Sequence, residues 1–214
     1  MSTPTLIIGN KRYSSWSLRP WLMMRMADIP FEEKLIPFND DYYENIEKHN
    51  PAKKVPALLD DGITVWDSMS IIEYLAETYT DKAIWPTDAK ARIMARNVAN
   101  EMHSGFFGLR GDYGMDVKAE LPEKQPEGDA AKDVARFEEI IKTSRAAFGA
   151  GGPFMFGAFS AADAMYAPVV FRLETYKVNV SADTRAYMDA VLALAPMQEW
   201  QAAGKLETYG YLWD

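Results

Sequence analysis

The chain has 214 residues, with 31 acidic against 23 basic side chains, and so carries a formal charge of −8 at pH 7. Hydrophobic residues make up 48% and charged residues 25%, as in a folded globular protein of one large or two small domains. Cysteine is absent and there are two histidines, His49 and His103. These counts exclude a disulfide framework, a cysteine nucleophile, a zinc ribbon and an iron–sulfur site, and we expect no metal. The acidic balance argues against nucleic acid as a partner, because nothing offsets repulsion from phosphates.

Targeting signals are not evident in the sequence. Residues 1–10 lack the basic region and the long apolar region of a secretory signal. Residues 146–162 carry no charge, but glycines and Pro153 interrupt them, and a membrane-spanning helix needs about 20 continuous apolar residues. We therefore expect a soluble, cytoplasmic protein that has no membrane partner.

Strands and helices alternate in the prediction for about the first 80 residues. Ser14 and Ser15 are N-cap signals ahead of a helix that begins near residues 16–18 and ends before Pro30. The apolar runs and turn residues predict the following other elements: strands at 6–8 and 31–37, a short helix at 42–48, a hairpin at 57–66 and a helix at 68–79.

The rest of the chain is predicted to be helical after a turn-rich linker at residues 80–89. The helices are expected at 90–109, 129–148, 183–194 and 196–203, with one more that opens at Ser160. Ser160 with Asp163 three residues later is a close relative of the capping box. The sequence therefore predicts an α/β domain over residues 1–80 and an all-α domain over residues 90–214.

Generic catalytic motifs are absent: the sequence has no nucleophile elbow, phosphate-binding loop, zinc-protease motif or dinucleotide-binding glycine pattern. Three local features are more informative. The serines at the first strand–helix junction lie where a helix N-terminus favours an anion. Val55–Pro56 allows a cis peptide that turns the backbone toward a ligand. Asp67–Ser68 could cap the next helix, or could hold the ammonium and carboxylate of a ligand. Taken singly, each feature fits a purely structural role better.

Together the three features resemble the glutathione site of cytosolic glutathione S-transferases. The segments that show this resemblance are residues 50–58 (NPAKKVPAL), 61–68 (DGITVWDS) and 71–75 (IIEYL). Residues 13–19 (YSSWSLR) look like the serine signature of the zeta and theta-like classes, and Ser160–Asp163 looks like the capping motif of the family's second domain. The resemblance implies a thioredoxin-like domain, an all-helical domain and a homodimer, with a role in detoxification.

The resemblance also implies roles for single residues. Ser14 matches the residue that activates the glutathione thiol, with Ser15 as a second candidate and Tyr13 as a weaker one. The residues implied to bind glutathione, the co-substrate, are Lys54 (with Lys53 as a weaker candidate), Val55, Pro56, Asp67 and Ser68.

The second substrate is expected to be a small hydrophobic electrophile bound by the helical domain. Aromatic residues and glycines gather near the end of its first helix, and the predicted pocket residues are Phe106, Phe107, Arg110 and Tyr113. Arg110 would meet an anionic electrophile. The same residues also fit an ordinary helical core.

The predicted function is a glutathione transferase, and two alternatives stay open. One is a glutathione-dependent isomerase of the maleylacetoacetate isomerase kind, although Trp16 stands where zeta-class enzymes have a cysteine. The other is a non-catalytic glutathione-binding or interaction module. The sequence does not separate conjugation from isomerisation or peroxidase activity. Because the chain has no cysteine, any sulfur chemistry must use the sulfur of the ligand.

Overall fold

A four-stranded mixed sheet forms the first part of the computed structural model, which describes residues 3–208. Its strands are β1 (Thr5–Ile8), β2 (Glu32–Leu35), β3 (Ala57–Asp60) and β4 (Ile63–Val65). They lie in the order β2-β1-β3-β4, with β1 parallel to β2 and the other two pairs antiparallel. β1 is one of the two interior strands, and its residues Leu6, Ile7 and Ile8 are fully buried.

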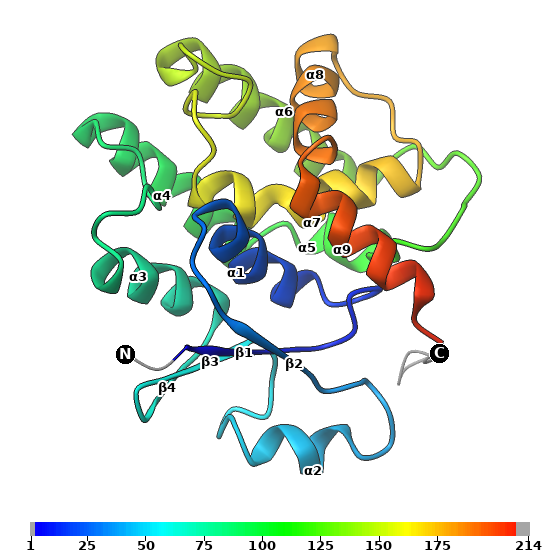
Figure 1. Ribbon diagram of the computed structural model, residues 1–214. Helices are drawn as coiled ribbons and strands as arrows, with labels where there is room; N and C mark the ends of the chain where they lie inside the picture. Colours follow the sequence, from blue (N-terminus) through cyan, green and yellow to red (C-terminus); the bar gives the residue numbers. More distant parts are fainter. Residues whose placement is uncertain (1–2, 209–214) are drawn as a thin grey trace.

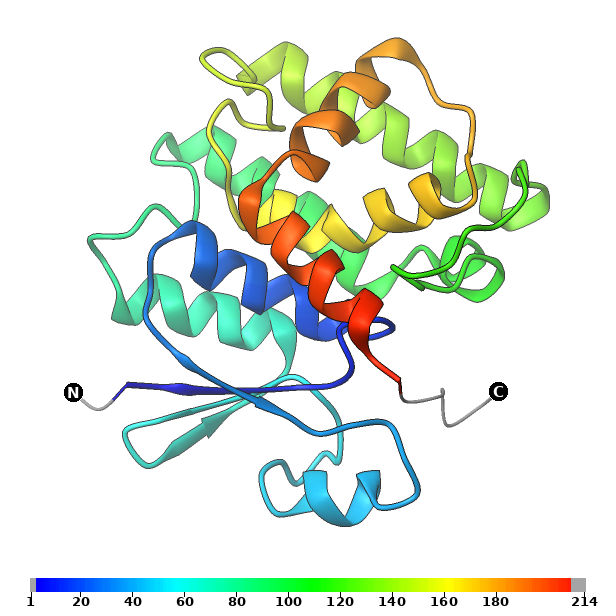
Figure 2. The same cartoon turned by 45° about the vertical axis from the view of Figure 1, so that its right-hand side comes forward.

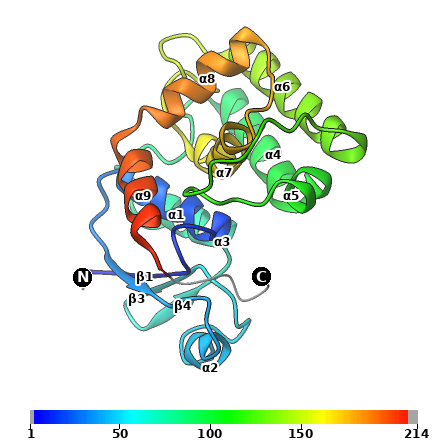
Figure 3. The ribbon, with the colours of Figure 1, turned by 90° about the vertical axis from the view of Figure 1, so that its right-hand side faces the viewer.

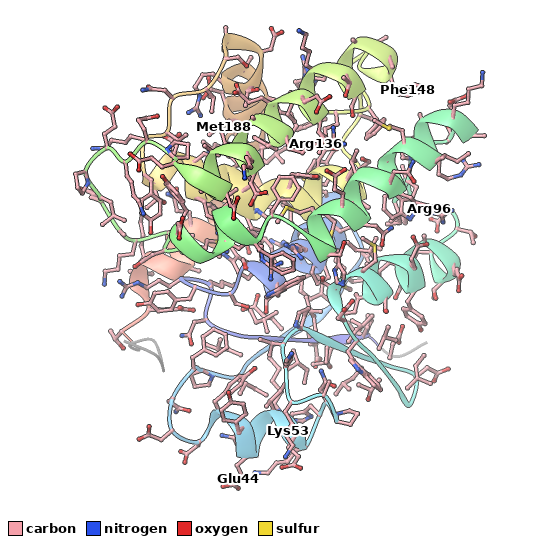
Figure 4. All side chains as sticks on the ribbon, turned by 180° about the vertical axis from the view of Figure 1, so that it is seen from behind. Glu44, Lys53, Arg96, Arg136, Phe148 and Met188 are labelled. Atoms are coloured by element: carbon pink, nitrogen blue, oxygen red, sulfur yellow. The ribbon has the colours of Figure 1, made fainter. Side chains whose placement is uncertain are left out.

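Helices cover both faces of this sheet. Helices α1 (Ser15–Met26) and α3 (Ser68–Thr78) lie side by side on one face, and α2 (Tyr42–Glu47) lies alone on the other (Figures 1 and 3). Figure 4 places Glu44 and Lys53 at the α2 end of the molecule, far from Met188 in the helical part. The strand and helix order of a thioredoxin-like domain is thereby confirmed.

The remaining described helices form a second, all-helical domain. They are α4 (Ala89–Ser104), α5 (Phe107–Asp112), α6 (Gly128–Phe148), α7 (Ala161–Thr175), α8 (Ala182–Leu192) and α9 (Ala195–Leu206). Helix α7 is its centre: every residue from Ala161 to Leu173 is buried. It begins with the predicted capping box of Ser160 and Asp163. It also packs against α1, and this contact joins the two domains.

One predicted helix is two helices in the structure. Residues 90–109 were expected to be continuous, but α4 ends at Ser104 and α5 begins at Phe107. Phe106 has a left-handed backbone with φ of 58°, and Gly105 is extended. A Cβ on Gly105 would lie 2.8 Å from the carbonyl oxygen of Glu101, so the turn needs glycine there. Among the described residues, no helix is both long and apolar enough to cross a bilayer.

Candidate active site

Residues from both domains line a cavity of about 880 Å³. On the side of the sheet domain its wall includes Ser14, Ser15, Lys54 and Val55, which are predicted site residues from the start of α1 and from the loop before β3. On the side of the helical domain its wall includes Phe107 and Arg110. The fold therefore brings the serine signature, the loop before β3 and part of the predicted electrophile pocket to one space.

Ser14 is the N-cap of α1. Its Oγ accepts a hydrogen bond from the Ser17 amide at 3.3 Å and lies 2.7 Å from the Ser17 Oγ. Ser17 is fully buried, and its Oγ also accepts a bond from the Gly9 amide at 3.1 Å. Ser14 is 5% exposed and Ser15, the first residue of the helix, is 8% exposed. The first turn of α1 thus lies on the cavity wall, with its Ser15 amide bonded to the Tyr13 carbonyl and its Ser17 amide capped by Ser14.

The hydroxyl pair leaves one proton available. Ser14 and Ser17 carry one hydroxyl proton each, and a single proton fits between oxygens 2.7 Å apart. In the structure the Ser14 Oγ donates to the Ser17 Oγ, so donation to a ligand requires the Ser14 hydroxyl to rotate toward the cavity while Ser17 becomes the donor of the pair. This arrangement suits the donation of a hydrogen bond to an anion in the cavity.

The loop before β3 presents backbone and a lysine to the same cavity. The Val55–Pro56 peptide is cis, as expected, and the β3 ladder begins only at Ala57. Asn50 is buried and shapes the loop, because its Nδ2 donates to the Lys54 carbonyl at 2.6 Å. Lys53 Nζ is paired with Glu47 at 2.8 Å, whereas Lys54 forms no ion pair with any described residue. Lys54 is therefore the freer cation on this wall.

Asp67 and Ser68 lie at the N-terminus of α3, outside the cavity lining. One carboxylate oxygen of Asp67 caps the helix through the Met69 amide at 3.0 Å. The other lies 3.1 Å from His103 Nε2 on α4. Ser68 is fully buried, and within the described part of the chain its Oγ has no hydrogen-bond partner. Asp67 therefore does cap the helix, and Ser68 keeps an unused donor and acceptor.

Trp16 lines the cavity and contacts His103, the residue that pairs with Asp67. Its ring lines the cavity and lies 3.9 Å from the guanidinium carbon of Arg19 and 4.8 Å from that of Arg110. His103 meets the same ring edge-on at 5.4 Å between centroids. Burial, together with the positive charges of Arg172 and Arg110, holds the pKa of Arg19 well below its ordinary value. The electrostatics of this wall thus favour an anion.

The predicted electrophile pocket is brought together only in part. Phe107 lines the cavity and is 71% exposed, and Arg110 lines it as well. Phe106 and Tyr113 are 5% and 1% exposed and lie in the core instead. Burial lowers the pKa of Arg110. Arg172, which sequence reasoning did not consider, lines the same wall from α7.

Sequence reasoning also missed Ser17, Arg19 and the role of His103. Ser17 and Arg19 lie inside the serine signature, and their helical spacing from Ser14 and Trp16 was a usable signal. His103 gave no such signal, because its contact with Asp67 joins residues that are far apart in the chain.

Comparisons with known proteins agree with this architecture. Residues 13–78 match the model of the glutathione S-transferase N-terminal domain, and residues 125–201 match that of the C-terminal domain. Maleylacetoacetate isomerase of Rattus norvegicus is 28% identical over 91% of this chain and 90% of its own. A Burkholderia glutathione transferase homolog with bound glutathione is similar in fold, with a TM-score of 0.70, 20% identity and coverage of 95% of this chain and 99% of its own. A diazinon-metabolizing glutathione S-transferase of the silkworm Bombyx mori gives a TM-score of 0.74 at 16% identity, over 95% of this chain and 98% of its own.

Proposed function

The chain belongs to the glutathione S-transferase superfamily, and on that premise we propose how its residues carry out glutathione transfer. Glutathione lies along the wall formed by Ser14, Ser15, Lys54 and Val55, and its thiol meets the Ser14 hydroxyl. The observation that carries the proposal is the position of Ser14, the N-cap of α1, on the wall of the shared cavity.

The proposed chemistry is stabilisation of the thiolate. A free thiol has a pKa of about 8.5, so little of it is ionised at neutral pH. Lowering that pKa by about two units requires about 2.7 kcal/mol of preferential anion stabilisation. A hydrogen bond to charged sulfur contributes about 1.5–3 kcal/mol, and a helix N-terminus adds about 0.3–1 kcal/mol. Ser14 and the first turn of α1 are together sufficient, and the thiol proton passes to solvent.

The remaining groups of glutathione are assigned to the predicted residues. Val55, before cis-Pro56, pairs with the cysteinyl backbone, and the free cation of Lys54 meets the glycyl carboxylate. Asp67 holds the γ-glutamyl ammonium through its exposed carboxylate. Ser68 is fully buried outside the cavity lining, so its unpartnered hydroxyl donates to the neighbouring ligand carboxylate only once the start of α3 moves to expose it. We propose that residues 1–80 bind glutathione and residues 90–214 select the electrophile.

The electrophile occupies the part of the cavity beside Phe107 and Arg110. The thiolate forms a bond to an electrophilic carbon, and the leaving group departs with its electron pair. The helical wall joins the exposed Phe107 ring to a guanidinium, so we propose a small hydrophobic electrophile, with acidic ones favoured through Arg110.

A glutathione-dependent isomerase is the second candidate, and the likeness to the rat isomerase over nine-tenths of this chain favours it. In that reaction the thiolate adds to a conjugated double bond, rotation follows, and the thiolate leaves again. Trp16 occupies the position of the zeta-class cysteine, and its ring is in cation–π contact with the guanidiniums of Arg19 and Arg110, which we take as support for the transferase.

The test compares three assays on the full chain: glutathione affinity, conjugation of an activated aryl chloride, and glutathione-dependent isomerisation of a cis-dienone. Conjugation that exceeds isomerisation is the expected result. Isomerisation alone would establish the second candidate, and binding without turnover on a broad panel of electrophiles would point to an interaction module.

We also propose a homodimer. Exposed apolar side chains occur on β4, on the loop that follows it and on α4, at Ile63, Trp66 and Ile93. These elements lie on one side of the molecule in Figures 1 and 2, where Arg96 of α4 pairs with Glu73 of α3. A cytoplasmic location stays a prediction from the lack of evident targeting signals in the sequence, and a role in detoxification stays a prediction of the family resemblance.

A further inference from the structure

The loop that delivers Ser14 is held by a carboxylate from the other end of the chain. Glu207, which follows α9, accepts the Lys11 amide at 2.8 Å and the Arg12 amide at 3.1 Å. It also accepts the side-chain amide of Asn10 at 3.1 Å. Figures 1 and 2 show the end of α9 beside this loop, between β1 and α1.

Glu207 fills the donors that the loop itself cannot satisfy. The Asn10 carbonyl accepts the amides of Tyr13 at 3.1 Å and Ser14 at 2.8 Å. Lys11 and Arg12 lie inside this turn, and no strand or helix of the described residues pairs their amides. The Glu207 carboxylate thus bonds two successive amides and the side chain of Asn10. It thereby holds Asn10 in place, and the Asn10 carbonyl in turn accepts the Ser14 amide.

The approach of α9 depends on Gly204. A Cβ at this position would lie 3.0 Å from the Arg12 amide nitrogen and 2.6 Å from a methyl of Val117. The helical domain holds the loop a second time, because Arg12 pairs with Asp116 through bonds of 2.8 and 2.7 Å. The loop is thus bound on both sides by parts of the chain that follow residue 115.

We propose that Glu207 is a positioning residue for Ser14: it sets the catalytic loop, and so the direction of the Ser14 hydroxyl, from the C-terminal end of the chain. The inference rests on the proposed role of Ser14. Glu207 lies outside the cavity lining, and we assign it no contact with glutathione.

The test uses Glu207→Ala and Glu207→Gln in the full chain. Glu207→Gln keeps the shape and one acceptor oxygen, so its effects should be intermediate. Glu199→Ala is the matched control, because Glu199 lies on α9, the helix that Glu207 follows, and pairs with Arg25 near the end of α1 that is far from Ser14.

The first measurement is amide hydrogen exchange of residues 9–14, which reports the loop without any catalysis. We expect exchange to accelerate at least tenfold in Glu207→Ala and less in Glu207→Gln, with no change in Glu199→Ala. Unchanged exchange in both Glu207 variants would overturn the inference and leave the role of Ser14 untouched.

The second measurement is the pKa of the glutathione thiol bound to each variant. Loss of the nearby Glu207 charge would by itself lower the pKa of the bound thiol, whereas displacement of Ser14 would raise it. The direction of the pKa change therefore separates the charge effect from the positioning effect. We expect a rise in the pKa of the bound thiol and a three- to tenfold fall in kcat, with glutathione affinity within twofold of the parent. A lower or unchanged pKa in the presence of faster exchange would contradict a positioning role. Failure of the proposed function itself would appear instead as a Ser14→Ala variant with unchanged turnover.

Discussion

Ser68 has the most informative side chain at the residue scale, because it is buried beside a helix N-terminus with its hydroxyl unused within the described part of the chain. A buried polar group without a partner costs stability, and natural proteins keep few of them. Ser144 on α6 shares this property, so the proposed role of Ser68 rests on its place at the N-terminus of α3 beside Asp67, where a ligand carboxylate would satisfy its hydroxyl.

Ser68→Ala should therefore separate binding from stability. We expect the dissociation constant of glutathione to rise about tenfold, from the loss of one charge-assisted hydrogen bond, while the free energy of unfolding stays the same or increases. Ser144→Ala is the control, because Ser144 on α6 is also buried with an unpartnered Oγ. Calorimetric binding and denaturant unfolding measure both quantities. Equal glutathione affinity in the two variants would remove Ser68 from the site.

Arg110 should decide charge preference among electrophiles. Arg110→Ala removes a partly buried guanidinium from the cavity wall, so kcat/KM for a carboxylate-bearing electrophile should fall about tenfold or more relative to a neutral one. Steady-state kinetics with a matched acidic and neutral pair measure the ratio, and Arg185→Ala on α8 is the surface control. Selectivity that Arg110→Ala leaves untouched would count against an anionic electrophile.

At the scale of elements, the capping box of α7 has a cost that depends on pH. Burial raises the pKa of Asp163 to about 6, even though hydrogen bonds from Met155 and Ser160 stabilise its charge. The unfolded chain has an ordinary aspartate, with a pKa of about 3.9. Between these values the folded state binds more protons, so this group makes the protein less stable as pH rises through 6.

The expected contribution is a loss of roughly 1 kcal/mol in unfolding free energy between pH 5 and pH 7.5. Asp163→Asn cannot ionise, so the pH dependence of its unfolding should lack this contribution. The variant should also be less stable at both pH values, because an amide NH2 replaces one of the two oxygens that accept from Met155 and Ser160. Urea unfolding of the parent and the variant at pH 5 and pH 7.5 measures this change in unfolding free energy. An identical pH slope in the parent and the variant would contradict the assignment.

Most elements could be predicted because their signals are local. Helix α1 starts at Ser15, one residue before the predicted range, since the capping serine and Pro20 both constrain it. The capping box of α7 was likewise readable from Ser160 and Asp163. The break between α4 and α5 was not predicted, because it depends on the left-handed backbone of Phe106, which no residue preference indicates.

At the scale of the whole molecule, the sequence predicted only those site residues that belong to short local motifs. Ser14, Lys54 and Val55 belong to short motifs and do meet at one cavity. Glu207 and His103 contact the site from remote elements, and Phe106 and Tyr113 turn into the core, because tertiary packing decides these positions. Helical spacing shows which residues share a face but not which faces meet.

The proposed dimer makes a prediction at this scale. The double substitution Ile63→Asp with Ile93→Asp puts two charges on the exposed apolar side chains of β4 and α4, so the dimer should dissociate into monomers. Leu35→Asp on β2, the opposite edge of the sheet, is the control. Light scattering after size-exclusion chromatography measures the mass. A double variant that elutes as a dimer would place the interface elsewhere.

The central claim is that the Ser14 hydroxyl stabilises the glutathione thiolate, and the pKa of the bound thiol tests it most directly. Ultraviolet absorbance of the thiolate, titrated with pH on the glutathione complex, gives this pKa for the parent and for Ser14→Ala. We expect a parent value about two units below the free thiol's 8.5, and a variant value shifted back by at least one unit. Glutathione affinity should be retained and turnover at least tenfold lower. The same pKa in both proteins would contradict the account and move the role to Ser15, Tyr13 or the backbone of α1.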